Sequence, residues 1–223
     1  MRKLKCHEIT GIIHCLSGLR IGGSDDLLKS GWADLTCIKH PVTLKPYIPG
    51  SSIKGKIRSE LEQKGGKITS DGKPCRCLQT DCLVCRIFGP HAQTQHQFGP
   101  PRIIVRDAQL KEAGEIERKS STGIDRTTNA ALRGALRSEE RVAADSTFTF
   151  RIGIQVWDLD EKADYENLKK VKKTGGMALV AFVLDGLKLV QRTGLGSGVS
   201  KGSGEVQFVE LQLDGQSIPE DLW

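Results

Sequence analysis

Four of the seven cysteines lie close together, in the spacing Cys75-x-Cys77-x4-Cys82-x2-Cys85. Two cysteines separated by two residues can direct both thiolates to one tetrahedral zinc ion, at Zn–S distances of about 2.3 Å. The surrounding segment has few apolar residues, and a bound metal contributes most to folding where little core is available. The cluster therefore predicts a structural zinc site with Cys75, Cys77, Cys82 and Cys85 as ligands.

Two other interpretations of this cluster stay open. Cys75 and Cys77 form a less usual pair, so His91 or His96 could replace one of them as a ligand. The thiols could also be unligated. A catalytic zinc is disfavoured, because four good ligands leave no position open for water or substrate.

The candidate acid–base groups give a weaker signal. The sequence contains no HExxH, GxSxG or paired-carboxylate motif. Asp25 and Asp26 are neighbours at a glycine-rich turn, and Asp34 follows in the same polar segment. Adjacent side chains in a loop often diverge, so these carboxylates alone do not define a catalytic centre.

Three segments could bind phosphate groups. Residues 18–26 (GLRIGGSDD) and 194–204 (GLGSGVSKGSG) are rich in glycine, which lets main-chain amides approach a phosphate closely. Residues 49–58 (PGSSIKGKIR) combine a predicted helix start, two hydroxyls and several cations. Neither glycine-rich segment matches a nucleotide fingerprint, so no nucleotide cofactor is expected. The alternative is two tight turns and an ordinary helix with a solvated basic edge.

Composition limits the possible partners and location. The 223 residues include 33 Lys and Arg against 27 Asp and Glu, a net charge of +6 that permits a polyanionic partner without proving one. No apolar stretch is long enough to span a membrane. The first residues lack the apolar region of a secretory signal, which predicts a cytoplasmic location without disulfides. Cys6, Cys15 and Cys37 are then expected to be small core residues.

The first half of the chain predicts a strand–helix–strand order. Residues 3–16 alternate as an opening strand, and residues 24–47 form a long loop. Apolar residues then recur every four positions from Ile53 to Leu61, in a helix for which Ser51 is the expected N-cap. Residues 102–108 form a second, short strand.

The second half shows the same order. Residues 148–156 alternate strictly between apolar and polar side chains, with Thr149 and Arg151 on the polar face. A helix follows over residues 176–191, and a final strand contains Val209, Leu211 and Leu213. The expected buried face of this helix consists of Val180, Val183, Leu184, Leu187 and Val190.

Together these elements predict one α+β domain over residues 1–223. The order resembles a ferredoxin-like β-α-β-β-α-β arrangement, in which two helices cover one face of an antiparallel sheet. Residues 65–98 form an inserted zinc-binding lobe. Residues 111–146 are charged and poor in large apolar residues, so they are expected to project as a lobe or hairpin.

Several motifs occur in one order along nearly the whole chain. They are GLRIGGSDD, Gly31-Trp32-Ala33-Asp34, Tyr47-Ile48-Pro49-Gly50-Ser51-Ser52-Ile53-Lys54-Gly55, Cys82-x2-Cys85-Arg86-Ile87-Phe88-Gly89, Gly123-Ile124-Asp125-Arg126-Thr127 and the C-terminal glycine-rich segment. This combination resembles the RNA-binding backbone subunit of type III-A CRISPR effector complexes, in the RAMP superfamily. The type III-D relatives share these motifs.

The resemblance implies a modified RNA-recognition fold with a zinc-binding insertion and a thumb-like projection. Several copies would polymerise along one CRISPR RNA, together with other effector-complex subunits and without a membrane. Target RNA would pair with this guide, and each thumb would displace one nucleotide at regular intervals. The family cleaves target RNA there in a reaction that needs Mg²⁺ or another divalent ion. The alternatives are an inactive RNA-binding scaffold of the same fold, and a zinc-stabilised RNA-binding module outside CRISPR.

The resemblance also implies roles for single residues. Asp34 matches the essential aspartate of the family, which would position the divalent ion or accept the 2′ proton of RNA. Ile124, Asp125, Arg126 and Thr127 would act at the thumb. The residues expected to hold guide RNA are Arg20, Gly22, Gly23, Ser24, Ser51, Ser52, Lys54, Arg58, Gly196, Ser200, Lys201 and Gly202. Lys201 stands where relatives commonly have Arg, which keeps the charge but loses bidentate phosphate contact.

Overall fold

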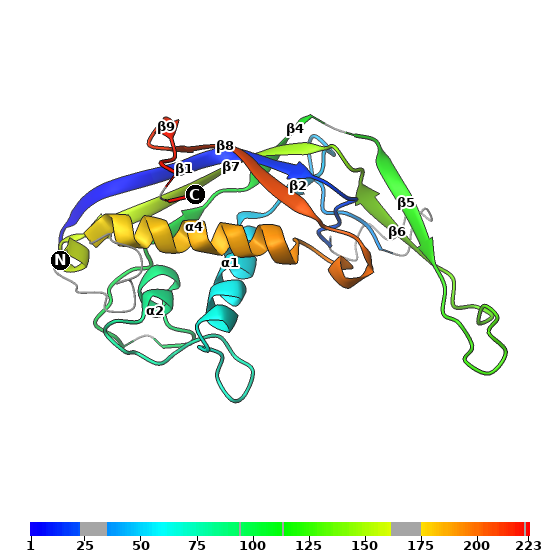
Figure 1. Cartoon of the computed structure of the whole chain (residues 1–223), viewed down its shortest axis with the longest axis horizontal. Helices are drawn as coiled ribbons and strands as arrows, with labels where there is room; N and C mark the ends of the chain where they lie inside the picture. Colours follow the sequence, from blue (N-terminus) through cyan, green and yellow to red (C-terminus); the bar gives the residue numbers. More distant parts are fainter. Residues whose placement is uncertain (23–34, 94, 113, 162–174, 221) are drawn as a thin grey trace.

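A mainly antiparallel sheet forms the centre of the molecule (Figure 1). The computed structural model describes residues 1–22, 35–93, 95–112, 114–161, 175–220 and 222–223. The sheet has the order β2-β4-β7-β1-β8-β9, and β3 also pairs with β7. Its strands are β1 (Lys3–Cys15), β2 (Tyr47–Ile48), β3 (Ile103–Val105), β4 (Ala108–Glu112), β7 (Thr147–Trp157), β8 (Val206–Leu213) and β9 (Gln216–Ser217).

Strand β7 shows why this sheet has one buried face. Phe148, Phe150 and Ile152 are buried, whereas Thr149 and Arg151 between them are exposed. Successive side chains of a strand point to opposite faces, so strict alternation places every second residue in the core. The predicted alternation and the polar face of this strand are both confirmed.

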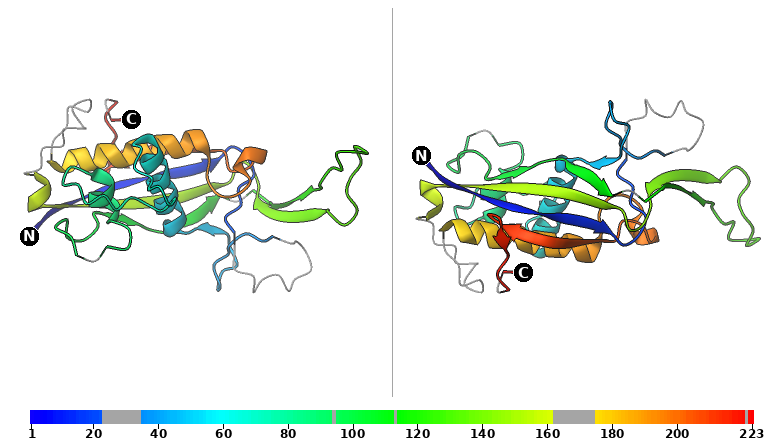
Figure 2. Two further views of the ribbon diagram at one scale, coloured as in Figure 1. Left: turned by 90° about the horizontal axis from the view of Figure 1, so that it is seen from below. Right: turned by 90° about the horizontal axis from the view of Figure 1, so that it is seen from above.

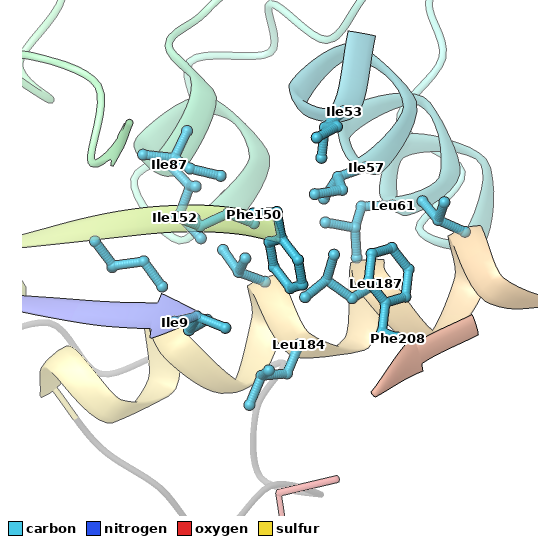
Figure 3. Close-up of a cluster of buried hydrophobic side chains, with 14 of the residues drawn as sticks. Ile9, Ile53, Ile57, Leu61, Ile87, Phe150, Ile152, Leu184, Leu187 and Phe208 are labelled. Atoms are coloured by element: carbon cyan, nitrogen blue, oxygen red, sulfur yellow. The ribbon is translucent and has the colours of Figure 1, made fainter. Parts of the chain in front are cut away.

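Two long helices cover the buried face, and the opposite face stays open (Figure 2). The helices are α1 (Gly50–Lys64), α2 (Leu83–Phe88), α3 (Asp158–Glu161) and α4 (Gly175–Thr193), with a short 3₁₀ turn at Val199–Lys201. Figure 3 shows Ile53, Ile57 and Leu61 of α1 directed into the cluster that contains Leu187 of α4. The buried face predicted for α4 is confirmed at all five positions.

A glycine allows α1 and α4 to cross closely. A Cβ atom at Gly186 of α4 would lie 2.5 Å from Cγ2 of Ile57 and 2.9 Å from Cδ1 of Leu61. Both distances are too short for carbon atoms, so any side chain at this position would push the helices apart. The close crossing explains a glycine in the middle of a long helix, where it otherwise weakens helix formation.

Three sequence-based predictions are wrong, and they concern the cap of α1, the strand at 102–108 and the burial of Cys6. The helix begins at Gly50 after Pro49 and has no side-chain cap, so Ser51 is not the N-cap. Instead, the Gly50 amide donates to Oδ1 of Asp107 at 2.8 Å. Asp107 lies between β3 and β4, so the strand predicted at 102–108 is two short strands. Cys6 is exposed, whereas Cys15 and Cys37 are buried as expected.

A two-stranded antiparallel hairpin extends from one end of the sheet (Figures 1 and 2). It consists of β5 (Ile116–Ser121) and β6 (Arg137–Val142), in a register that pairs Ile116 with Val142 and Ser121 with Arg137. Within the described chain, no helix is long and apolar enough to cross a membrane.

Candidate metal centre and nucleic-acid interface

The four clustered cysteines converge on one point. Sγ of Cys75 lies 3.9 Å from Sγ of Cys82 and 3.6 Å from Sγ of Cys85, which in turn lies 3.9 Å from Sγ of Cys77. All four sulfur atoms lie within 4.8 Å of one another. A tetrahedron with Zn–S distances of about 2.3 Å has S···S edges of about 3.8 Å. The donor set and its dimensions therefore fit a four-coordinate metal such as zinc.

The histidines stay outside this group. Among the residues that the structure describes, neither His91 nor His96 belongs to the cluster. His91 contributes only its amide, which donates to the main-chain oxygen of Cys75 at 3.0 Å, and the His96 ring packs near Phe98. The spatial arrangement thus favours four thiolate ligands over a mixed set.

The clustered thiols differ in the direction in which their pKa values are shifted. Hydrogen bonds from neighbouring thiols, above all Cys85, lower the pKa of Cys82 to about 5, despite its burial. Burial raises the pKa of Cys75 to about 11, and the nearby Cys82 sulfur contributes to raising the pKa of Cys85. The protein alone therefore stabilises one thiolate, and a divalent cation would compensate the repulsion among four.

An ion pair on α1 fixes the cysteine cluster to the core. Nε of Arg58 lies 2.7 Å from Oε1 of Glu62, which accepts the Cys75 amide at 2.9 Å. Nη2 of Arg58 also donates to the Cys75 oxygen at 3.1 Å. These bonds compensate the guanidinium charge. The contacts of Arg58 therefore favour a role in holding the cysteine cluster over the predicted role in binding RNA.

A buried ionic network fixes the other side of the same lobe. Nε and Nη2 of Arg102 lie 2.9 and 3.0 Å from the two carboxylate oxygens of Asp160, and both side chains are 0% exposed. Arg86 of α2 lies 3.2 Å from Asp160 and donates to the Thr80 oxygen at 2.7 Å. Arg102 also donates to the main-chain oxygens of the segment before it. The network joins the lobe to α3, next to Cys85.

The start of α1 presents polar groups and a poorly compensated cation. Ser51 is exposed, and Ser52 and Lys54 are half-buried. Burial, followed by the positive charge of Arg58, lowers the pKa of Lys54 below the ordinary value of 10.5. A half-buried ammonium group beside a helix N-terminus is stabilised by an anion.

The two glycine-rich segments lie side by side, although they are far apart in sequence. The Ser197 amide donates to the Arg20 oxygen at 3.0 Å, and the Gly204 amide donates to the Gly18 oxygen at 3.0 Å. A Cβ atom at Gly196, where φ is +81°, would overlap the Arg20 oxygen. Glycine is therefore required for the contact as well as for the backbone conformation.

Four residues of the C-terminal segment face solvent. Gly196, Ser200, Lys201 and Gly202 are all exposed. In the first segment, the Arg20 side chain lies 3.6 Å from Glu139 of β6, and Gly22 forms a β-bridge with Cys37. The predicted residues Gly23, Ser24 and Asp34 lie outside the described residues.

The motif at the hairpin tip forms a tight turn. Oδ1 of Asp125 accepts the Thr127 amide at 2.7 Å and the Thr128 amide at 3.0 Å. These bonds, that of Thr128 foremost, lower the pKa of Asp125. Arg126 and Thr127 are exposed, as is Ile124. Asp125 thus shapes the turn, and its neighbours are free to contact a partner.

Sequence reasoning missed the residues that connect these parts. Asp160 and Arg102 are 58 positions apart and carry no motif, and Glu140 and Arg141 lie in a charged segment without periodicity. Their roles arise from contacts between distant segments. One local feature of the sequence could have indicated this network, namely the position of Arg86 next to the predicted zinc ligand Cys85.

This combination of a sheet, a projecting hairpin and apposed glycine-rich loops agrees with the family comparison. A model of the RAMP superfamily matches residues 12–207. The chain therefore belongs to the RAMP superfamily, and the family predicted from the motifs is confirmed.

Individual relatives show which members of the superfamily this chain resembles. The chain is 36% identical to the CRISPR system Cms endoribonuclease Csm3 of Methanothermobacter thermautotrophicus, over 96% of this chain and 87% of that protein. It is 35% identical to the same-named protein of Methanocaldococcus jannaschii, over 92% of this chain and 79% of the relative. A solved Csm3–Csm4 subcomplex of the type III-A CRISPR-Cas interference complex contains a chain that is 26% identical, with a TM-score of 0.58, covering 96% of this chain and 80% of that one.

Proposed function

We propose that this protein is the guide-RNA-binding backbone subunit of a type III-A CRISPR effector complex, and that it cleaves target RNA matched to the guide. The observation that carries this proposal is the 36% identity to a Csm3 endoribonuclease over 96% of the chain. Its proposed partners are CRISPR RNA, target RNA, further copies of itself and other effector subunits, in the cytoplasm. The type III-A subcomplex among its structural neighbours supports that subtype.

We further propose that the core is ferredoxin-like and carries two inserted parts. The strand order β4-β7-β1-β8 with α1 and α4 on one face supports this assignment. Residues 65–98 would form the zinc-binding lobe, and residues 111–146 the thumb-like projection. The projecting hairpin, which lies within the second range, and the convergent thiols, which lie within the first, support the existence of these two parts.

Guide RNA would lie along the apposed glycine-rich loops and the start of α1. The exposed amides and side chains of the C-terminal loop, together with Lys54, offer donors to phosphates without reading bases. Sequence would then be read by base pairing, as a guide holder requires. The exposed Arg126 and Thr127 would act where the thumb interrupts the duplex.

Asp34 would be the catalytic residue for RNA cleavage. The RNA 2′-oxygen attacks the adjacent phosphorus and loses its proton, the bond to the 5′-oxygen breaks, and the leaving 5′-oxygen takes up a proton from water. Asp34 would accept the 2′ proton or hold a divalent ion, which stabilises the negative charge on the phosphate when it is bound. The products of this step are a 2′,3′-cyclic phosphate and a 5′-hydroxyl.

One assay tests the proposed function. The complex is purified with its guide, the co-purified RNA is sequenced, and matched and unmatched target RNAs are incubated with Mg²⁺. We expect repeat-derived guide ends and cleavage of the matched RNA alone, at regular intervals. Binding of matched RNA without cleavage would identify an inactive scaffold, and mixed co-purified RNA would indicate a general RNA-binding module.

Removal of one thiol tests the zinc proposal. We expect about one zinc per chain by metal analysis, and Cys82→Ala should lose it and destabilise the 65–98 lobe, because three thiolates bind the ion less tightly. Cys6→Ala is the matched control, because Cys6 is exposed and outside the cluster. A fully folded protein without metal would contradict the proposal.

The lowered pKa of Lys54 predicts a pH dependence of guide binding. Lys54 loses its charge as the pH rises through a pKa below 10.5, so guide affinity should fall with rising pH and begin to fall at a lower pH than for an unperturbed lysine. Lys54→Arg should remove much of this fall, since arginine stays charged. Lys56→Ala is the control, because Lys56 is paired with Glu60 at 2.6 Å. An identical pH profile for wild type and Lys54→Arg would exclude Lys54 from the interface.

A further inference from the structure

Three consecutive residues of β6 each contact a different segment of the body. Glu139 lies 3.6 Å from Arg20, after β1. Glu140 lies 2.6 Å from Nζ of Lys39. Arg141 donates to Oγ of Ser203 in the C-terminal glycine-rich loop at 2.9 Å. The segment Glu139–Arg141, named here the β6 clamp, therefore joins the base of the hairpin to both glycine-rich segments.

Glu140 makes the densest set of these contacts. Its carboxylate accepts the Cys37 amide at 3.1 Å, and its main-chain oxygen accepts Sγ–H of Cys37 at 3.1 Å. Its own amide donates to the Leu35 oxygen at 2.8 Å. Glu140 is 7% exposed, so these bonds are largely shielded from water and hold their partners firmly.

The chain on both sides of residues 23–34 is attached to the same strand. Leu35 exchanges main-chain bonds with β6, since its amide donates to the Ser138 oxygen at 3.3 Å. Leu19 forms a two-way bridge with Val142, at 2.9 and 2.8 Å. Leu35 directly follows Asp34 in sequence. Strand β6 thus holds Leu19 and Leu35, which lie on either side of the sequence segment that bears Asp34.

We infer that the β6 clamp sets the position of RNA cleavage relative to the hairpin, with Glu140 as its central positioning residue. This inference rests on the proposed function. One strand holds the hairpin, the predicted guide-binding loops and the residue next to Asp34 at fixed separations. Because misplacement of a reacting group by about 1 Å can lower a rate by about 100-fold, such a connection determines which phosphodiester bond is cut.

Hydrogen exchange of the full chain tests whether the clamp holds the segment. In Glu140→Ala, the Cys37 amide loses its carboxylate acceptor, and exchange in a peptide that covers residues 35–39 should accelerate by about tenfold or more. Glu140→Gln keeps an acceptor oxygen and should retain much of the protection. Glu115→Ala is the matched control, an exposed glutamate at the base of the same hairpin. Unchanged exchange in Glu140→Ala would overturn the inference.

Cleavage by the assembled complex tests whether the clamp positions the reaction. With saturating target, Glu140→Ala should lower the single-turnover rate by about 10- to 100-fold and produce cuts at additional positions, with target affinity unchanged. Glu140→Gln should restore both in part. A purely structural role would lower the yield of complex and leave the positions of the cuts unchanged.

The two proposals fail in different ways. Absence of cleavage by a wild-type complex with bound guide and target would overturn the proposed function. Normal wild-type cleavage with the same rate and cut positions in Glu140→Ala would overturn only the positioning role.

Discussion

Asp34→Ala is expected to lower the rate of target-RNA cleavage by about 10²- to 10⁴-fold, which is the range of a positioned acid–base group. The scissile strand already carries its nucleophile, so a single carboxylate can account for most of what the protein contributes at the reacting atoms. Guide loading should be unchanged, because the amides and cations proposed to hold the guide lie on other segments. The measurements are single-turnover cleavage of a matched RNA and a guide-binding titration on the same preparation.

Two further variants sharpen this test. Asp25→Ala removes a carboxylate from the glycine-rich segment that precedes Asp34 and should leave cleavage nearly unchanged. Asp34→Asn keeps the size of the side chain and removes its charge and basicity, so it should be almost as inactive as Asp34→Ala. Cleavage at the wild-type rate by both Asp34 variants would remove this residue from the mechanism.

Asp160→Ala is expected to lower the free energy of unfolding by about 3 to 5 kcal/mol, because it leaves buried cations without their counter-charge. Arg102 is 0% exposed and binds both carboxylate oxygens, and Arg86 binds one of them. The Asp160 carboxylate also accepts the Trp157 amide at 2.8 Å. Urea denaturation monitored by circular dichroism measures this loss. Zinc affinity should fall as well, because Arg86 adjoins Cys85.

An exposed ion pair supplies the matched control. Asp185 lies 2.9 Å from Nζ of Lys64, and both side chains are over a third exposed. Asp185→Ala should therefore change the free energy of unfolding by less than about 1 kcal/mol. A similar small effect for Asp160→Ala would mean that water enters the Arg102 site and that the network does not hold the lobe.

Local patterns were sufficient to predict the main elements. Period-two alternation predicted β1 and β7, and period-four spacing predicted α1 and the buried face of α4, because burial of one face of a regular element depends on neighbouring residues. The zinc-site thiols were equally readable, since close spacing alone brings Cys82 and Cys85 together. These features depend on residues within a few turns of one another.

Contacts between distant segments could not be read in this way. The Gly50 amide bonds to Asp107 in place of the expected Ser51 cap, and Asp107 lies between the two short strands found where one was predicted. Arg58 has the same charge whether it binds RNA or supports the cysteine cluster. Only its contacts with Glu62 and Cys75 in the folded chain favour the second role.

The sequence by itself determined the two long helices, strands β1, β7 and β8, the clustered thiols and the family of this protein. Only the tertiary structure decided which charges are compensated, and that β6 joins the hairpin to the segments on either side of Asp34. The physical reason is that a charge–charge contact depends on the distance between two atoms. Arg102 and Asp160 are far apart in sequence and share no periodic pattern, so only folding sets the distance between them.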